Sequence, residues 1–168
     1  PETIKYLISR FCKKDEEKKH IIQEVFLKTS RDCASHLINT LIKAEDIYTR
    51  KNIFNILVML GEDARIEAES LFLDNRWFVV RQMVSLVGHI GSLKSLENLK
   101  PLLKYNDVRV RKEVLSAIAR IPLKESTNIL IAALKTQEKD IVLHTILLLS
   151  SLKDCSSVPF LMALALQK

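Results

Sequence analysis

Apolar residues recur along the chain at a spacing that predicts a series of amphipathic α-helices. One pattern places them at positions i, i+3, i+4 and i+7, and it occurs five times, beginning at Ile22, Ile53, Met83, Val114 and Thr145. The successive starts are all about 31 residues apart, a period typical of repeat arrays. Because this spacing puts four side chains on one stripe of a helix, we expect five copies of one helix, called the A helix here.

A second pattern lies between the copies of the first. It has apolar positions at i, i+3 and i+7, and its six copies begin at Ile4, Ser35, Ile66, Leu96, Thr127 and Val158. These starts follow the same period as the first pattern, so the two patterns keep step along the chain. The second pattern predicts a B helix, and it is weakest in the third copy, where Glu69 takes the middle position and the neighbouring Ala68 and Phe72 leave the phase of the stripe open. A unit repeated at such a period is typical of solenoid proteins.

The two patterns together predict an all-α fold, a right-handed α-α superhelix of about five helix pairs preceded by one leading helix. Only three Gly and four Pro support this expectation, because tight β-hairpin turns depend on those residues. We expect one array, with a leftover helix at 1–12 and repeats at 15–43, 46–73, 76–104, 107–135 and 138–167. Neighbouring pairs should stack to bury their apolar stripes and curve into a concave surface lined by B helices. Pro101 lies inside a B helix and should bend it.

Two stretches resemble a known family. Residues 79–91 read VVRQMVSLVGHIG, and residues 110–122 read VRKEVLSAIARIP. Both resemble the helix of HEAT repeats, and most closely the short repeats of about 31 residues first named for phycobilisome lyase subunits. The resemblance implies an armadillo-type solenoid that acts as a non-catalytic scaffold for a protein or peptide. These repeats define no catalytic residue, so lyase activity is not expected.

The two ends of the array look like interior repeats. Ile4, Leu7 and Phe11 fit the B pattern, so the chain opens on the second helix of a repeat. Residues 158–166, VPFLMALAL, are apolar on nearly every side, whereas a terminal repeat needs a polar outer face. We therefore expect a segment of a longer protein, whose other domains are further partners. The alternatives are a second copy covering the last helix, or an imperfect cap.

Positive charge gathers in the second half of the chain. The formal net charge is +6, and residues 94–124 hold eight basic residues against Glu97, Asp107 and Glu113, a net of +5. Such a patch, with Trp77, Phe78 and Tyr105 in nearby turns, suggests nucleic-acid binding as an alternative function. The opposing interpretation is a solvated outer face on which Asp107 pairs with Arg111 four residues later, and Trp77 packs between repeats.

The candidate contact residues follow from these two hypotheses. Exposed B-helix positions and the basic turn before the fourth A helix form the set. Its members are Lys94, Glu97, Asn98, Lys104, Arg109, Arg111, Lys112, Asn128 and Lys135. We expect them to contact a protein or peptide, or DNA under the alternative.

Other chemistry finds little support in the sequence. The three cysteines form no CxxC pair, which favours a reduced, cytoplasmic protein without disulfides. Cys33 and His36 share one helical face, with Cys12 and His20 upstream, but this spacing fits no paired zinc pattern. No nucleophile elbow, phosphate-binding Gly loop or HExxH motif is present, so neither an enzyme nor a cofactor is expected. The chain shows no apolar run long enough to suggest a membrane partner.

Overall fold

The computed structural model describes residues 2–11, 19–152 and 154–166. These residues form helices joined by short turns, and no strand occurs among them. The eleven α-helices are α1 (Glu2–Phe11), α2 (Lys19–Lys28), α3 (Ser30–Lys43), α4 (Ile47–Leu60), α5 (Glu62–Ser70), α6 (Trp77–Ile90), α7 (Ser95–Leu99), α8 (Val108–Ala119), α9 (Lys124–Ala133), α10 (Lys139–Leu152) and α11 (Val158–Leu166). Two 3-10 helices, η1 (Lys100–Lys104) and η2 (Cys155–Ser157), complete the set.

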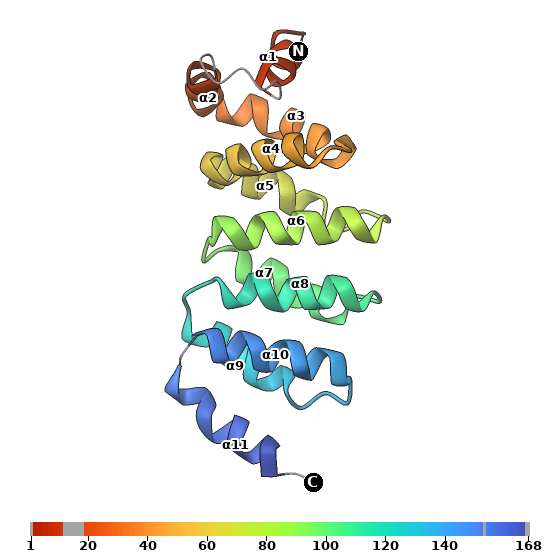
Figure 1. The fold of residues 1–168 in the computed structure, drawn as a ribbon, viewed down its shortest axis with the longest axis vertical. Helices are drawn as coiled ribbons and strands as arrows, with labels where there is room; N and C mark the ends of the chain where they lie inside the picture. The colour runs from red at the N-terminus through yellow and green to blue at the C-terminus, as the bar shows by residue number, and fades with distance from the viewer. Residues whose placement is uncertain (1, 12–18, 153, 167–168) are drawn as a thin grey trace.

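The helices stack in order from the first to the last, with the two termini at opposite ends (Figure 1). One layer is formed by the A helices α4, α6, α8 and α10, which lie roughly parallel and side by side. The B helices α5, α7 and α9 lie behind this layer. Contacts join each helix to its neighbours in the stack, such as α4 to α6 and α6 to α8. The predicted all-α solenoid is therefore confirmed.

The predicted A stripes form the core at the centre of the stack. In α4, Ile53, Ile56, Leu57 and Leu60 are all buried. Toward the ends this burial declines: Val25 of α2 and Leu152 of α10 are exposed. One buried cluster runs from α1 to α8, and a smaller one joins α8, α9 and α10.

Two of the predicted B stripes are out of phase with the buried face. In α5, Ile66 is 53 % exposed and Leu73, beyond its end, is 92 % exposed. Ala64, Ala68 and Phe72 are buried instead, because a shift of one or two residues turns a helix by about 100° or more. In α3 the predicted Ile38 is buried, but Leu37 and Leu41 complete the buried stripe in place of the predicted Ser35 and Ile42, which are half-buried.

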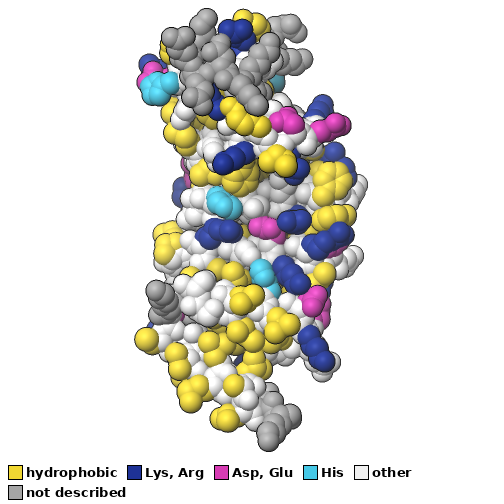
Figure 2. All heavy atoms as spheres, in the orientation of Figure 1, with side chains coloured by type: hydrophobic (Ala, Val, Ile, Leu, Met, Phe, Trp, Pro, Cys, Tyr) yellow, Lys and Arg dark blue, Asp and Glu magenta, His cyan; other side chains and the backbone are white. Residues whose placement is uncertain are grey.

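The last predicted B stripe is only partly covered: Leu161 packs against the smaller core cluster, but no residue of the stripe is fully buried. None of Val158, Leu161 and Ala165 is buried, and α11 contains no buried residue at all. Phe160, Met162 and Leu166 of the same helix are exposed. The apolar side chains form a broad patch over this end of the molecule (Figure 2). Among the described residues, no helix is both long enough and apolar enough to cross a membrane.

Pro101 lies where the predicted B helix changes from α to 3-10 geometry. The α-helix α7 ends at Leu99, and the chain continues as the 3-10 helix η1 with Pro101 in its first turn. Proline has no N–H to donate to the carbonyl four residues earlier, and its ring crowds that carbonyl. The tighter 3-10 turn accommodates both effects.

Candidate partner-binding groove

The predicted contact residues divide between two parts of the fold. Lys94, Glu97, Asn98, Lys104, Asn128 and Lys135 lie on or beside α7, η1 and α9, and all six are exposed. Arg109, Arg111 and Lys112 lie on α8, where Arg109 is exposed and the other two are half-buried. The structure therefore distributes the set over a B-helix group and an A-helix group.

Most of the basic residues in this region are already paired with acids. Lys94 Nζ lies 3.1 Å from Glu62, and Lys112 Nζ lies 3.3 Å from Asp140. Lys100 Nζ contacts both Glu97 and Glu125 at 2.6 Å. Four of the acids used, Glu62, Glu125, Glu138 and Asp140, lie outside residues 94–124. Stacking brings acids of neighbouring repeats next to these cations. The net charge of +5 counted within residues 94–124 is therefore higher than the net charge of the surface that these residues form.

The predicted pair between Asp107 and Arg111 is wrong. Asp107 caps α8 by accepting a hydrogen bond from the Arg109 N–H, and it also accepts from the Arg109 guanidinium at 3.0 and 2.7 Å. These bonds with Arg109 lower the pKa of the Asp107 carboxyl to about 2. Arg111 instead pairs with Glu138 at the start of the next repeat and donates to the Tyr105 carbonyl oxygen. A carboxylate at the cap is directed at the helix end, which favours the nearer side chain.

The same turn occurs one repeat earlier. Asp74 accepts from the Arg76 N–H at 2.8 Å and from its guanidinium at 3.0 and 2.8 Å. Arg109 connects the two turns, because its guanidinium stacks 3.5 Å above the ring centre of Trp77. Trp77 is thus held between repeats, in agreement with its predicted packing role. The shared motif Asp-x-Arg at positions 74–76 and 107–109 was a signal that the sequence analysis missed.

A hollow lies elsewhere, on the A-helix layer between α4 and α6. It is a groove with a volume of about 580 Å³. Its lining comes from the end of α3, from α4 and α6, and from one residue of α8. The lining residues are Leu41, Ile42, Ala44, Ile47, Arg50, Lys51, Phe54, Asn55, Phe78, Arg81, Gln82, Ser85 and Glu113. None of the predicted contact residues is among them.

Apolar side chains line much of the groove. Ile47 is 81 % exposed and Phe78 is 47 % exposed, so both present apolar surface to solvent. Phe54 is held by an edge-to-face contact with His89, whose ring centre lies 5.1 Å away. His89 is itself fixed by a hydrogen-bond contact of 2.8 Å between its Nδ1 and the Ser85 carbonyl oxygen. The groove therefore offers a preformed aromatic wall.

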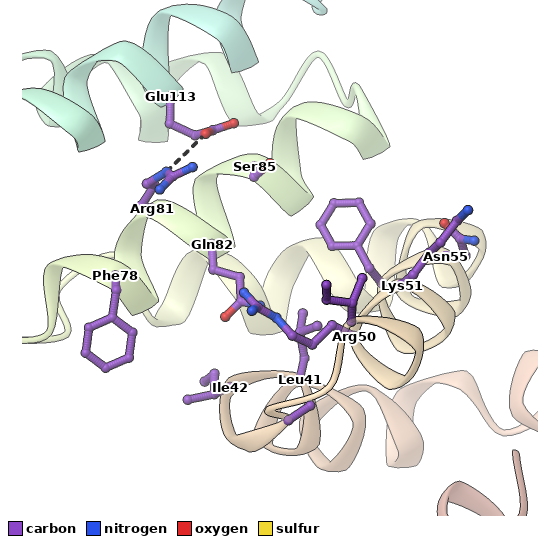
Figure 3. A pocket seen from close by; sticks show the side chains of 13 residues that line it. Leu41, Ile42, Arg50, Lys51, Asn55, Phe78, Arg81, Gln82, Ser85 and Glu113 are labelled. Carbon is purple, nitrogen blue, oxygen red and sulfur yellow. Dashed lines mark hydrogen bonds and ion pairs between the residues drawn. The ribbon is translucent and has the colours of Figure 1, made fainter. Parts of the chain in front are cut away.

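Cations surround this apolar surface. Arg50 and Lys51 extend from α4 and Arg81 extends from α6 (Figure 3). Arg81 Nε donates to Glu113 at 3.4 Å, and its side chain is half exposed. Neither Arg50 nor Lys51 forms an ion pair with an acid in the described ranges. With three cations against one carboxylate, the lining has a net charge of +2.

A second, smaller hollow lies between the repeats formed by α8, α9 and α10. It has a volume of about 360 Å³ and is lined mainly by apolar residues, including Leu103, Leu115 and Ile129. Arg111 and Glu138, which form an ion pair with each other, also line it. Because its charged residues pair with each other and the rest of its lining is mainly aliphatic, this hollow has few groups that could bind a particular ligand selectively.

Cys33, one of the residues weighed as metal ligands, has another contact. Cys33 is buried, and its Sγ lies 3.2 Å from the Thr29 hydroxyl. Cys12 lies outside the described residues. Within the ranges that the structure describes, no group of three His, Cys, Asp or Glu side chains is placed to hold a metal ion.

Comparison with known proteins identifies the repeat unit. Residues 71–150 match the family model of HEAT repeats. A search of curated proteins found no match. HEAT repeats generally act as protein-interaction scaffolds and are typically non-catalytic. The matched region runs from the end of α5 to α10, and the stacked helices continue on both sides of it. Residues 71–150 therefore match HEAT repeats, and they form part of an all-α solenoid.

Proposed function

We propose that this protein is a non-catalytic scaffold that binds a segment of another protein in the groove between α4 and α6. The observation that supports this proposal is the combination of an apolar, aromatic wall with two cations, Arg50 and Lys51, that have no described acidic partner. Concave sites with an apolar surface and a few polar groups are typical of binding sites. From the sequence we expected the partner to bind the B helices, whereas this proposal places the binding site on the A-helix layer.

The pairing of surface charges favours a protein ligand over DNA. A nucleic acid needs a track of cations that neutralises successive phosphates. Along the basic region, five of eight cations are engaged by carboxylates, which leaves Lys104, Arg120 and Lys124 without a described ion pair. These three are spread over η1, the end of α8 and the start of α9. A localised groove suits a short peptide segment better.

The proposal is tested by selecting binders from a displayed peptide library and measuring their affinity for two variants. Ile47→Asp places a carboxylate in the groove, and Leu73→Asp makes the same change at an exposed apolar residue outside it. We expect Ile47→Asp to weaken binding by about tenfold or more and Leu73→Asp to leave it unchanged. Peptides that bind both variants equally well would contradict the proposal.

A parallel titration tests the DNA alternative. Labelled duplex and single-stranded DNA are added to the wild type at two salt concentrations. The proposal predicts no retention of either at physiological salt. Binding that falls steeply as salt rises, and that weakens when Arg109, Arg111 and Lys112 are all changed to Glu, would replace the peptide proposal with the DNA alternative.

A further inference from the structure

A column of cations follows the A-helix layer at the period of the repeats. Its members are Lys19, Arg50, Arg81 and Lys112, one on each of α2, α4, α6 and α8. Basic side chains are visible along this face of the molecule (Figure 2). A residue repeated at the period of the array occupies the same place in each stacked unit.

Three members of the column have a polar partner on the next A helix. Lys19 Nζ donates to the Tyr48 hydroxyl at 3.1 Å and to Asn52 Oδ1 at 3.0 Å on α4. Arg81 pairs with Glu113 on α8, and Lys112 pairs with Asp140 on α10.

Arg50 is the exception. Within the described part of the chain, no hydrogen bond or ion pair joins its side chain to α6. The column thus has one vacant partner position, and it lies in the groove.

The partners of the other three cations lie 28 to 33 residues further along the chain, and the equivalent stretch after Arg50, residues 78–83, contains no acid. Arg81 pairs with the residue 32 positions later, Glu113. The residue at the same offset after Arg50 is Gln82, which lines the same groove and has no negative charge. The neighbouring Lys51 adds a second cation. Arg50 therefore lacks a carboxylate partner at a place where it lines an apolar hollow.

We infer that the groove takes an acidic segment of a protein partner, whose carboxylates contact Arg50 and Lys51 while an apolar side chain packs between Phe54 and Phe78. This inference rests on the proposed function and adds the chemistry of the ligand to it. The ligand carboxylate takes the role that Glu113 takes one repeat further along. Electrostatic complementarity of this kind provides specificity, and the buried apolar side chain provides affinity.

The inference is tested by fluorescence anisotropy with three labelled synthetic peptides. The first has the sequence Glu-Glu-Leu-Phe-Glu-Asp, the second has Lys at each acidic position, and the third has Ala in place of Leu and Phe. We expect the first peptide to bind at least about tenfold more tightly than each of the others, because it alone carries both features. Equal binding of the acidic and basic peptides would overturn the inference.

Charge reversal in the protein tests which cations are used. The variant Arg50→Glu with Lys51→Glu should lose affinity for the acidic peptide by about tenfold or more and gain affinity for the basic one. The matched control, Lys104→Glu with Arg120→Glu, changes the net charge equally at exposed positions outside the groove. A control that weakens binding as much as the groove variant would show long-range attraction and overturn the inference.

Two single substitutions, one adding a carboxylate to the groove and one removing a carboxylate from it, provide a further test. Gln82→Glu gives Arg50 an internal partner and should weaken acidic-peptide binding severalfold. Glu113→Gln removes the partner of Arg81 and should strengthen binding. Circular dichroism confirms that each variant folds. If library peptides require the groove but show no preference for acids, this inference fails while the proposed function stands; if none requires the groove, both fail.

Discussion

At the scale of single residues, Gly88 sets how closely α6 and α8 approach. A Cβ placed on Gly88 would lie 2.6 Å from the Cα and 2.7 Å from the Cβ of Ala117. The obstacle includes backbone, so one helix must move. We predict that Gly88→Ala lowers the free energy of unfolding by about 1 to 3 kcal/mol.

The direction in which Gly88→Ala changes the free energy of unfolding tests whether α6 and α8 are in close contact. In a helix without such a contact, Gly→Ala stabilises by roughly 0.5 to 1 kcal/mol because Ala has the higher helix propensity. Urea denaturation of the wild type and Gly88→Ala provides the measurement. A stabilised variant would show that the two helices are further apart than the structure places them.

The Asp-x-Arg turns predict a dependence of stability on pH. Hydrogen bonds from Arg76 and Arg109 hold the pKa values of Asp74 and Asp107 at about 2, below the ordinary value of 3.8. Their contribution to stability is present above the ordinary pKa and is lost as the pH falls toward 2. The melting temperature should therefore be constant near neutral pH and fall between about pH 4 and pH 2.

Substitution of both turns tests this assignment. The variant Asp74→Asn with Asp107→Asn should melt at a lower temperature at pH 7 and show a smaller decrease in acid. Glu45→Gln, which changes an exposed carboxylate outside the turns, serves as the control and should follow the wild type. If the melting temperature falls by the same amount in acid for all three proteins, the two Asp-x-Arg turns do not cause the fall, and the assignment is wrong.

At the scale of elements, α5 departs from the other B helices by carrying a nearly buried ion-pair network. Arg65 is 7 % exposed, and it donates to Glu62 at 2.9 and 2.8 Å and to Glu69 at 2.5 Å. Glu69 also accepts from Asn98 Nδ2 at 2.6 Å, which joins α5 to α7. The helix therefore carries an ion-pair network beside its buried alanine stripe.

Removal of Arg65 should cost more than removal of the whole pair. Arg65→Ala leaves the Glu69 carboxylate unpaired and poorly solvated, and we predict a loss of about 3 kcal/mol in unfolding free energy. The double variant Arg65→Met with Glu69→Leu should recover most of this loss, because apolar residues of similar size can replace a buried pair. Urea denaturation distinguishes the two cases, and equal losses would contradict the network.

The same helix shows how far periodicity can predict an element. Spacing alone identified α5 as a helix but placed Ile66 and Leu73 on its buried side, whereas both are exposed. Alanines form the actual buried stripe, at positions 64 and 68. Small residues contribute little to a hydrophobic pattern, so the close helix packing that they permit is hard to predict. Where large apolar residues form the stripe, as in α4 and α8, the predicted phase is correct.

At the scale of the whole molecule, the repeat predicts the architecture but not the surface. The nearly constant period of the two apolar patterns identified the stack of helix pairs, because each pair must bury its apolar stripe against a neighbour. The surface depends on contacts between residues about one period apart, such as Lys94 with Glu62. Counting charges within residues 94–124 missed these partners. The groove was missed for a related reason, since its lining is assembled from α3, α4, α6 and α8, which belong to successive repeats.

The most direct test of this account is a map of backbone chemical shifts of the isotopically labelled protein during titration with the acidic peptide. The account predicts perturbations confined to the groove on α4 and α6, centred on Arg50, Lys51, Phe78 and Gln82, and their disappearance with the basic peptide. Perturbations centred instead on α7 and α9 would return the interaction surface to the B helices and contradict the assignment of the groove.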